Sequence, residues 1–226
     1  VITADMNARD SYRKKMNMNA NSYQGYKNLM RYGYTLQYVR NTLQLNQGFI
    51  TDDAADSLHH PIFSEIAFYA GIAETDWSWS PAVADFDNDG LRDIIITNGY
   101  PRDVTDNDFV SYRTEANRFA SWSTMMEQIP QIKIPNYVYH NNGNAQFEDV
   151  TKAWGMDLPS FSNGAAYADL DRDGDLDYIV NNINDPAFLY ENTLNDQKTP
   201  PNFLRFGFDG PLLNKGGLGA ILKLYY

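Results

Sequence analysis

Short apolar segments bounded by polar turns recur along this chain, and they predict β-strands. Residues 94–97 (Ile-Ile-Ile-Thr) and 178–181 (Tyr-Ile-Val-Asn) are rich in β-branched side chains and are bounded by Asn or Gly. The segment before each of them carries small residues at alternate positions, namely Ala82, Ala84, Ala166 and Ala168. Small side chains with a period of two suit a strand that is crowded against neighbouring strands.

The same order of elements occurs twice, with a constant separation of 84 residues. The matched pairs are Phe63/Phe147, Glu65/Asp149, Ile66/Val150, Gly71/Gly155, Ala82/Ala166, Ala84/Ala168, Asp85/Asp169 and Asp93/Asp177. Residues 43–48 match residues 138–143, residues 187–192 begin a third such strand, and residues 1–3 are similar to the strand that follows each acidic stretch. Self-similarity of this kind is typical of repeat architectures. We therefore predict an all-β fold made of four-stranded antiparallel units, the blades of a β-propeller.

Two acidic stretches, residues 85–93 and 169–177, share the pattern D-x-D-x-D-G-x-x-D. Carboxylates at positions 1, 3, 5 and 9, with the carbonyl at position 7, form an oxygen cage that suits a hard cation, and calcium fits best. The alternative is a pair of solvated acidic turns, since Asp and Gly favour turns in any case. An EF-hand is excluded, because position 12 is Ile96 or Val180 and a predicted strand follows each loop.

These residues resemble the FG-GAP or VCBS repeat, the blade unit of integrin α-type propellers, over about residues 37–200. In that family, calcium binds in the loop between the first two strands of a blade. The resemblance implies two structural Ca²⁺ sites. Their ligands would be Asp85, Asp87, Asp89, the Leu91 carbonyl and Asp93, and, in the second copy, Asp169, Asp171, Asp173, the Asp175 carbonyl and Asp177.

The C-terminal segment differs in pattern from the repeats. It reads Asn202-Phe-Leu-Arg-Phe-Gly-Phe-Asp-Gly-Pro, and then Asn-Lys-Gly-Gly-Leu-Gly-Ala-Ile-Leu-Lys-Leu-Tyr-Tyr226. It is similar to the opening of an ASPIC/UnbV module. We therefore expect propeller blades over residues 1–201 and the beginning of an ASPIC/UnbV-like module over residues 202–226, with an apparent strand near Ile221.

Length and charge add further expectations. The chain has 226 residues and a net charge of −11. Two complete repeats cannot close a ring that needs at least four blades, so we expect a piece of a larger propeller. Nothing forms a basic patch, which argues against nucleic acid as a partner. No run of about 18 apolar residues predicts a transmembrane segment. Weak calcium sites fill outside the cytosol, so we expect an extracellular, cell-surface or periplasmic protein.

Two insertions interrupt the repeats. In residues 101–135, apolar residues recur at helical spacing and predict an amphipathic helix, capped by Asp106 or Asp108 and ended by Pro130. This helix would pack over the propeller face, or form a lid or a partner surface. Residues 49–61 contain the adjacent pair His59 and His60, whose side chains would point to opposite sides of an extended chain, which disfavours a metal site. Trp77 and Trp79, with Phe161 at the place of Trp77 in the second copy, are expected to fill the seam between blades or to form a sugar-stacking platform.

Motifs that carry catalysis are absent from the sequence. It has no H-E-x-x-H, no G-x-S-x-G and no phosphate-binding G-x-x-x-x-G-K-[ST]. We therefore expect a calcium-binding extracellular propeller module that binds protein or glycan ligands. The alternative is a carbohydrate-active enzyme, a polysaccharide lyase or hydrolase, on the same scaffold.

Overall fold

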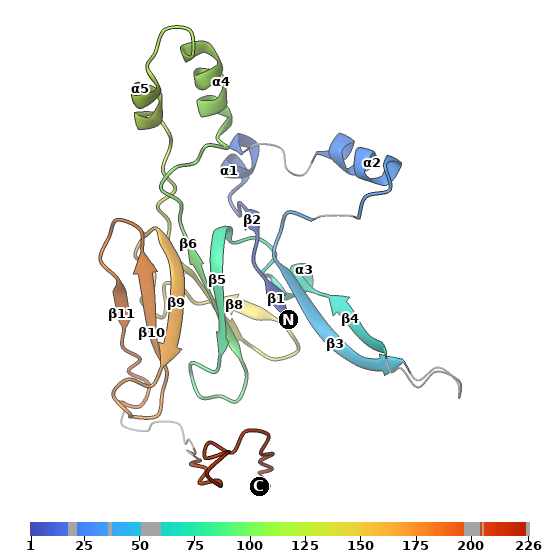
Figure 1. Ribbon diagram of the computed structural model, residues 1–226, viewed down its shortest axis with the longest axis vertical. Helices are drawn as coiled ribbons and strands as arrows, with labels where there is room; N and C mark the ends of the chain where they lie inside the picture. The colour runs from blue at the N-terminus through green and yellow to red at the C-terminus, as the bar shows by residue number, and fades with distance from the viewer. Residues whose placement is uncertain (18–21, 36–37, 51–59, 197–203, 205, 225–226) are drawn as a thin grey trace.

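The computed structural model describes residues 1–17, 22–35, 38–50, 60–196, 204 and 206–224. Three antiparallel sheets lie side by side (Figure 1). The first has the order β1 (Ile2–Thr3), β3 (Thr42–Ile50), β4 (His60–Glu65). The second has the order β2 (Met6–Asn7), β5 (Asp76–Ala84), β6 (Asp93–Asn98), β7 (Tyr137–Asn141), β8 (Phe147–Asp149). The third has the order β11 (Phe188–Tyr190), β10 (Asp177–Asn182), β9 (Ser162–Ala168).

The sheets follow the predicted repeat. In the second sheet, β5 to β8 form the expected four-stranded meander, while β9 to β11 repeat its first three strands. The register pairs Ala84 with Asp93 and Ala168 with Asp177, so both acidic loops close equivalent hairpins. The all-β fold of propeller-type blades is therefore confirmed.

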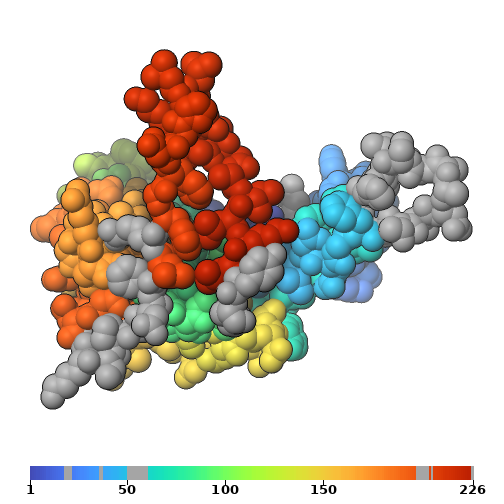
Figure 2. Space-filling view, turned by 90° about the horizontal axis from the view of Figure 1, so that it is seen from below, coloured from blue at the N-terminus to red at the C-terminus, as the bar shows by residue number. Residues whose placement is uncertain are grey.

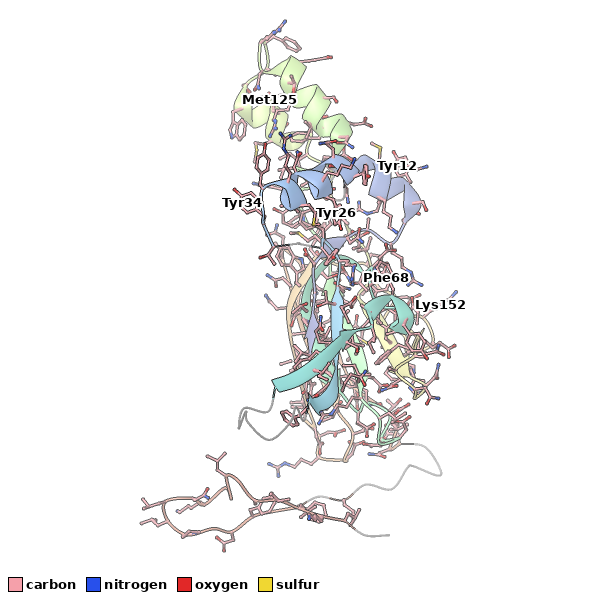
Figure 3. All side chains as sticks on the ribbon, turned by 90° about the vertical axis from the view of Figure 1, so that its right-hand side faces the viewer. Tyr12, Tyr26, Tyr34, Phe68, Met125 and Lys152 are labelled. Atoms are coloured by element: carbon pink, nitrogen blue, oxygen red, sulfur yellow. The ribbon has the colours of Figure 1, made fainter. Side chains whose placement is uncertain are left out.

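The turn after the fourth strand also repeats. After β4 of the first sheet it is the short helix α3 (Ala67–Ala70), which ends at Gly71 with φ 80°. After β8 of the second sheet Gly155 has φ 71° at the matching place. Phe68 and Lys152 are equivalent positions in these two turns, and Figure 3 shows them on the same side of the molecule.

Strand β6 is buried on both faces because it lies between two other blades. Ile94 and Ile96 pack in a first seam towards the first sheet, with Ala67, Ala70, Ile72, Ala73 and Tyr139. Ile95 packs in a second seam towards the third sheet, with Ala82, Ala84, Phe86, Val138, Met156, Tyr178 and Val180. The predicted crowding of Ala82 and Ala84 is confirmed, whereas the equivalent Ala166 and Ala168 are exposed.

The predicted single helix in residues 101–135 is wrong in detail. The segment forms two helices, α4 (Asn107–Ala116), capped by Asp106, and α5 (Trp122–Glu127), capped by Ser121. They project from one end of the sheets beside α1 (Ser11–Met16), instead of lying across a blade (Figure 1). Met125, labelled in Figure 3, is buried there, while Phe119 and Trp122 are exposed.

The aromatic residues at the start of β5 have separate environments. Trp77 is buried and stacks on Tyr100 with ring centroids 4.5 Å apart, and Phe161 is also buried. Trp79 is 41% exposed, and its indole N–H donates to the Gly99 carbonyl at 2.8 Å. The packing interpretation therefore holds for Trp77 and Phe161, and Trp79 retains an accessible face.

The remaining segments fall outside the repeat. Helix α2 (Tyr23–Arg31) belongs to the tyrosine-rich region and exposes Tyr23 and Tyr26. Of the insertion over residues 49–61, residues 51–59, which include His59, lie outside the described residues. The described part of the tail, 204 and 206–224, has turns but no strand, so the strand expected near Ile221 is not present. Within the described ranges, no helix has the length and apolar character needed to cross a bilayer.

Candidate metal centres

The two acidic loops lie at the same end of the sheets, opposite α4 (Figure 1). Figure 2 looks at this end and shows the region of the first loop in green and the third sheet in orange. Both loops have a left-handed residue at positions 4 and 6: Asn88 (φ 56°) and Gly90 (φ 90°), then Arg172 (φ 71°) and Gly174 (φ 102°). The glycine at position 6 permits the sharp turn, as its place in the pattern predicted.

The structure brings most of the predicted carboxylate ligands together. Ligand oxygens of Asp85, Asp87 and Asp93 lie within 4.8 Å of one another in the first loop, and those of Asp169, Asp171 and Asp173 do so in the second. Asp89 instead groups with Asp87 and His140. Asp177 lies outside the second group, and the carbonyls of Leu91 and Asp175 remain predicted ligands.

The loop backbones hold these side chains in place. In the first loop the Asp85 carboxylate accepts hydrogen bonds from the Asp89 and Gly90 N–H groups at 3.1 and 2.9 Å, and Asp89 accepts from the Leu91 N–H at 2.7 Å. In the second loop Asp171 accepts from the Asp173 N–H at 3.2 Å. Each loop is thus preorganised with its carboxylates turned inward.

The aspartate at position 9 has a second task. Asp93 is fully buried, and its two oxygens accept from the Phe86 N–H at 3.1 Å and the Asn141 N–H at 2.9 Å. The second loop repeats both bonds, each at 2.9 Å, between Asp177 and the N–H groups of Leu170 and Asn192. Position 9 therefore ties the loop to the third strand of its blade.

Electrostatics favour a cation in these loops. Burial raises the pKa of Asp87, and the neighbouring Asp93 and Asp89 carboxylates raise it further. Burial also raises the pKa of Asp93, and it raises the pKa of Asp175 to about 6. Crowded carboxylates repel one another, and an oxygen-binding cation relieves this repulsion. The oxygen-only set of aspartates fits calcium, whose ligands are carboxylates and carbonyls.

Sequence reasoning missed two asparagines, namely Asn141 at the end of β7 and Asn192 just after β11. The Asn141 side chain donates to the Arg92 carbonyl at 3.0 Å, and the Asn192 side chain donates to the Phe86 carbonyl at 2.8 Å. Asn88 of the first loop also donates to the Gly174 carbonyl of the second at 3.4 Å. The two loops are therefore in contact. The Asn-x-Gly motif at the end of the third strand was the available signal for Asn141. The motif does not reveal that the Asn141 side chain bonds to the Arg92 carbonyl.

We expect the calcium response of the protein to weaken in acid. A carboxyl whose folded pKa is raised favours its protonated form, so this contribution to folding is present at low pH and is lost as the pH rises through the raised pKa. For Asp175 the window runs from about 4, the ordinary value, to about 6. The ionised Asp175 carboxylate adds negative charge beside the predicted ligands Asp173 and Asp177. Burial also raises the pKa of the predicted ligands Asp87 and Asp93. The rise in melting temperature that calcium causes should therefore be smaller at about pH 5 than at about pH 7.5.

Differential scanning fluorimetry at these two pH values, with and without calcium, measures this difference. Subtracting the metal-free curve at each pH removes the titration of carboxyls elsewhere in the chain. An equal calcium response at both values would contradict the effect of the raised pKa values.

Comparisons with known proteins agree with the geometry. A family model described as FG-GAP repeat matches residues 77–112, and one described as FG-GAP-like repeat matches residues 107–180. Cartilage acidic protein 1 of Mus musculus is 42% identical over 57 residues, which is 25% of this chain and 9% of that protein. The Homo sapiens protein is 40% identical over 57 residues, which is 25% of this chain and 9% of that protein. The Xenopus tropicalis protein is 37% identical over 62 residues, which is 26% of this chain and 10% of that protein. The matches therefore span about a tenth of each relative. The chain carries FG-GAP repeats between residues 77 and 180.

Proposed function

We propose that this chain is a calcium-binding, extracellular propeller module that serves as a binding or scaffold domain for protein or glycan ligands. In this proposal the metal has a structural role. Each ion neutralises the aspartates of one loop and so fixes the hairpin between the first two strands of its blade.

One observation carries the proposal. Two loops with the same D-x-D-x-D-G-x-x-D pattern each hold three aspartates with ligand oxygens within 4.8 Å, at equivalent hairpins of neighbouring blades. Solvated acidic turns would gain nothing from such convergence, because pairs of carboxylates at about 4 Å repel by roughly 4 kcal/mol at an effective dielectric near 20.

The extracellular part of the proposal is supported by the expected affinity. Calcium sites of extracellular modules have dissociation constants of roughly 0.1–1 mM and are empty at cytosolic calcium levels. The FG-GAP matches support the same location, whether secreted, at the cell surface or in the periplasm. We also propose the division into blades over residues 1–201 and an ASPIC/UnbV-like module over residues 202–226.

A cavity beside the first loop is a candidate place for a ligand group. Its volume is about 360 Å³, and its lining includes Asp87, Trp154, Tyr190 and Glu191 but no lysine or arginine. Carboxylates next to aromatic faces suit the hydroxyls and apolar face of a neutral sugar, or a cationic side chain of a partner protein. They disfavour anionic ligands. The enzymatic alternative gains no support here, because the one histidine side chain that the structure describes, His140, lies against the loop.

Calcium titration tests the proposal. Isothermal titration calorimetry should find two calcium ions per chain, and Asp87→Ala or Asp171→Ala should each remove one. At ten times the dissociation constant each ion adds about 1.4 kcal/mol, which is roughly 3–6 °C in melting temperature for a chain of this size. Both variants should therefore melt lower in calcium and respond less to added calcium.

Asp157→Asn is the matched control, because it removes an exposed carboxylate outside the loops. This control should keep the full calcium response. Unchanged melting of the wild-type protein after a chelator is added would refute the structural role of calcium.

A further inference from the structure

His140 is placed at the first acidic loop in a way that the calcium proposal does not require. It lies in β7, next to Asn141, whose N–H donates to Asp93. Its Nδ1 atom is 3.1 Å from an Asp87 oxygen and 3.3 Å from an Asp93 oxygen. This nitrogen is buried, and neither contact has the geometry of a hydrogen bond.

The distances are those of neighbouring ligands around one small cation. Zinc binds nitrogen and carboxylate oxygen at about 2.0–2.1 Å in tetrahedral sites, so two of its ligands are about 3.3 Å apart. The two contacts of Nδ1 match this edge length. Asp89 belongs to the same group, since one ligand atom from each of Asp87, Asp89 and His140 lies within 4.8 Å of the others.

The chemistry of the nitrogen narrows the choice of metal. Calcium takes oxygen ligands, whereas imidazole is a preferred ligand of zinc and related transition metals. Two or three carboxylates with one imidazole form a mixed oxygen and nitrogen set. Such a set suits zinc better than an all-oxygen loop does.

The second loop serves as an internal comparison. Asn192 makes the same bond to Asp177 that Asn141 makes to Asp93, so the residues before them, Glu191 and His140, are equivalent. At this place the second unit offers a carboxylate instead of an imidazole. Among the described residues, only the first loop combines aspartates with a histidine.

We propose that His140 lets the first acidic loop take zinc in place of calcium, with Asp87, Asp89 and His140 as the zinc ligands and with Asp93 beside them, while the second loop takes calcium alone. This inference rests on the proposed function in one respect only, namely that the loops bind divalent cations. Both loops share one sequence pattern, and the inference adds that only the first of them also accepts zinc.

Zinc titration of the full chain tests the assignment. Replacing His140 by glutamine keeps the size of the side chain and removes the ligand nitrogen. His140→Gln should weaken zinc binding by about 10- to 100-fold, at least the range found for residues one step removed from a metal. The same variant should leave the number of bound calcium ions at two. Asp171→Asn, in the second loop, is the matched control and should keep the zinc affinity of the wild-type protein.

A second measurement separates a direct ligand from a merely structural residue. The chain has three histidines, so its imidazole ¹⁵N resonances can be assigned by substitution. Zinc should shift the Nδ1 resonance that His140→Gln lacks, and it should do so in a His59→Gln/His60→Gln background. Unchanged zinc affinity in His140→Gln, or an Nδ1 resonance that does not move with zinc, would overturn the inference. If calorimetry of the same protein still finds two bound calcium ions, the proposed function stands. A chain that binds neither zinc nor calcium would overturn both proposals.

Discussion

We expect Gly99→Ala to lower the free energy of unfolding by about 2–5 kcal/mol, which corresponds to roughly 4–20 °C in melting temperature. Gly99 follows β6 and has φ 112°, a conformation that favours glycine. A Cβ atom there would lie 2.2 Å from the Ser160 carbonyl oxygen and 2.8 Å from the Phe161 Cα. Both are backbone atoms of the segment that leads into the third sheet, so no side-chain rotation relieves the clash. The seam between the second and third blades would have to open.

Gly155→Ala is the matched control for this prediction. Gly155 also has positive φ (71°), but a Cβ atom there meets nothing within 4 Å. This control measures the backbone strain alone, about 1–2 kcal/mol. Chemical denaturation of both variants gives the two free energies. If Gly99→Ala is no less stable than Gly155→Ala, the close approach of the two blades at Gly99 is wrong.

The second large effect is expected for Asp93→Ala. This change removes a predicted calcium ligand and leaves the Phe86 and Asn141 N–H groups without their acceptor. A buried unsatisfied donor costs about 1–3 kcal/mol. The loss of a buried carboxylate with a raised pKa offsets part of this cost. We expect a net loss of about 2–4 kcal/mol in calcium and a smaller loss without it.

Asp89→Ala separates the two tasks of Asp93. Asp89 is a predicted ligand in the same loop, but it is exposed and bonds only within the loop. This variant should lose stability in calcium and should melt like the wild-type protein in chelator. Asp93→Ala should melt lower in both conditions. Equal melting of the two variants in chelator would show that Asp93 does not brace the loop against the third strand.

The hairpins and their acidic loops could be predicted because their signals are local and occur twice. An Asp-rich loop with glycine at position 6 dictates a tight turn, and β-branched residues on both sides dictate strands. The repeated pattern also predicted that residues 43–48 and 187–192 belong to further, incomplete blades at the two ends of the repeat region. The FG-GAP resemblance rested on these same residues and is confirmed by the family matches.

Apolar spacing could not predict how the helical insertion is divided or which of its side chains are covered. Apolar spacing continues through Phe119 and Trp122 and therefore predicts one helix. In the structure α4 ends at Ala116, and Ser121 caps a second helix. No glycine or proline marks this break. Periodicity also cannot tell whether an apolar stripe is covered, and here Phe119 and Trp122 face solvent.

The candidate sites were predictable in composition but not in their surroundings. His140 and Asn192 reach the first loop from residues far along the chain, and no spacing rule connects them with it. The left-handed Arg172 had no sequence signal either, because arginine rarely adopts positive φ. The His140 contact depends on the pairing of β7 with β6 inside one blade, and the Asn192 contact depends on how neighbouring blades meet.

The alternation along β6, with Ile94 and Ile96 on one side and Ile95 on the other, has an evolutionary consequence. The two sides of a blade are unlike each other, and each suits the opposite side of a similar unit. A head-to-tail contact of this type can be reused by every added copy. Tandem duplication of one ancestral gene segment could therefore lengthen such a protein without inventing a new interface.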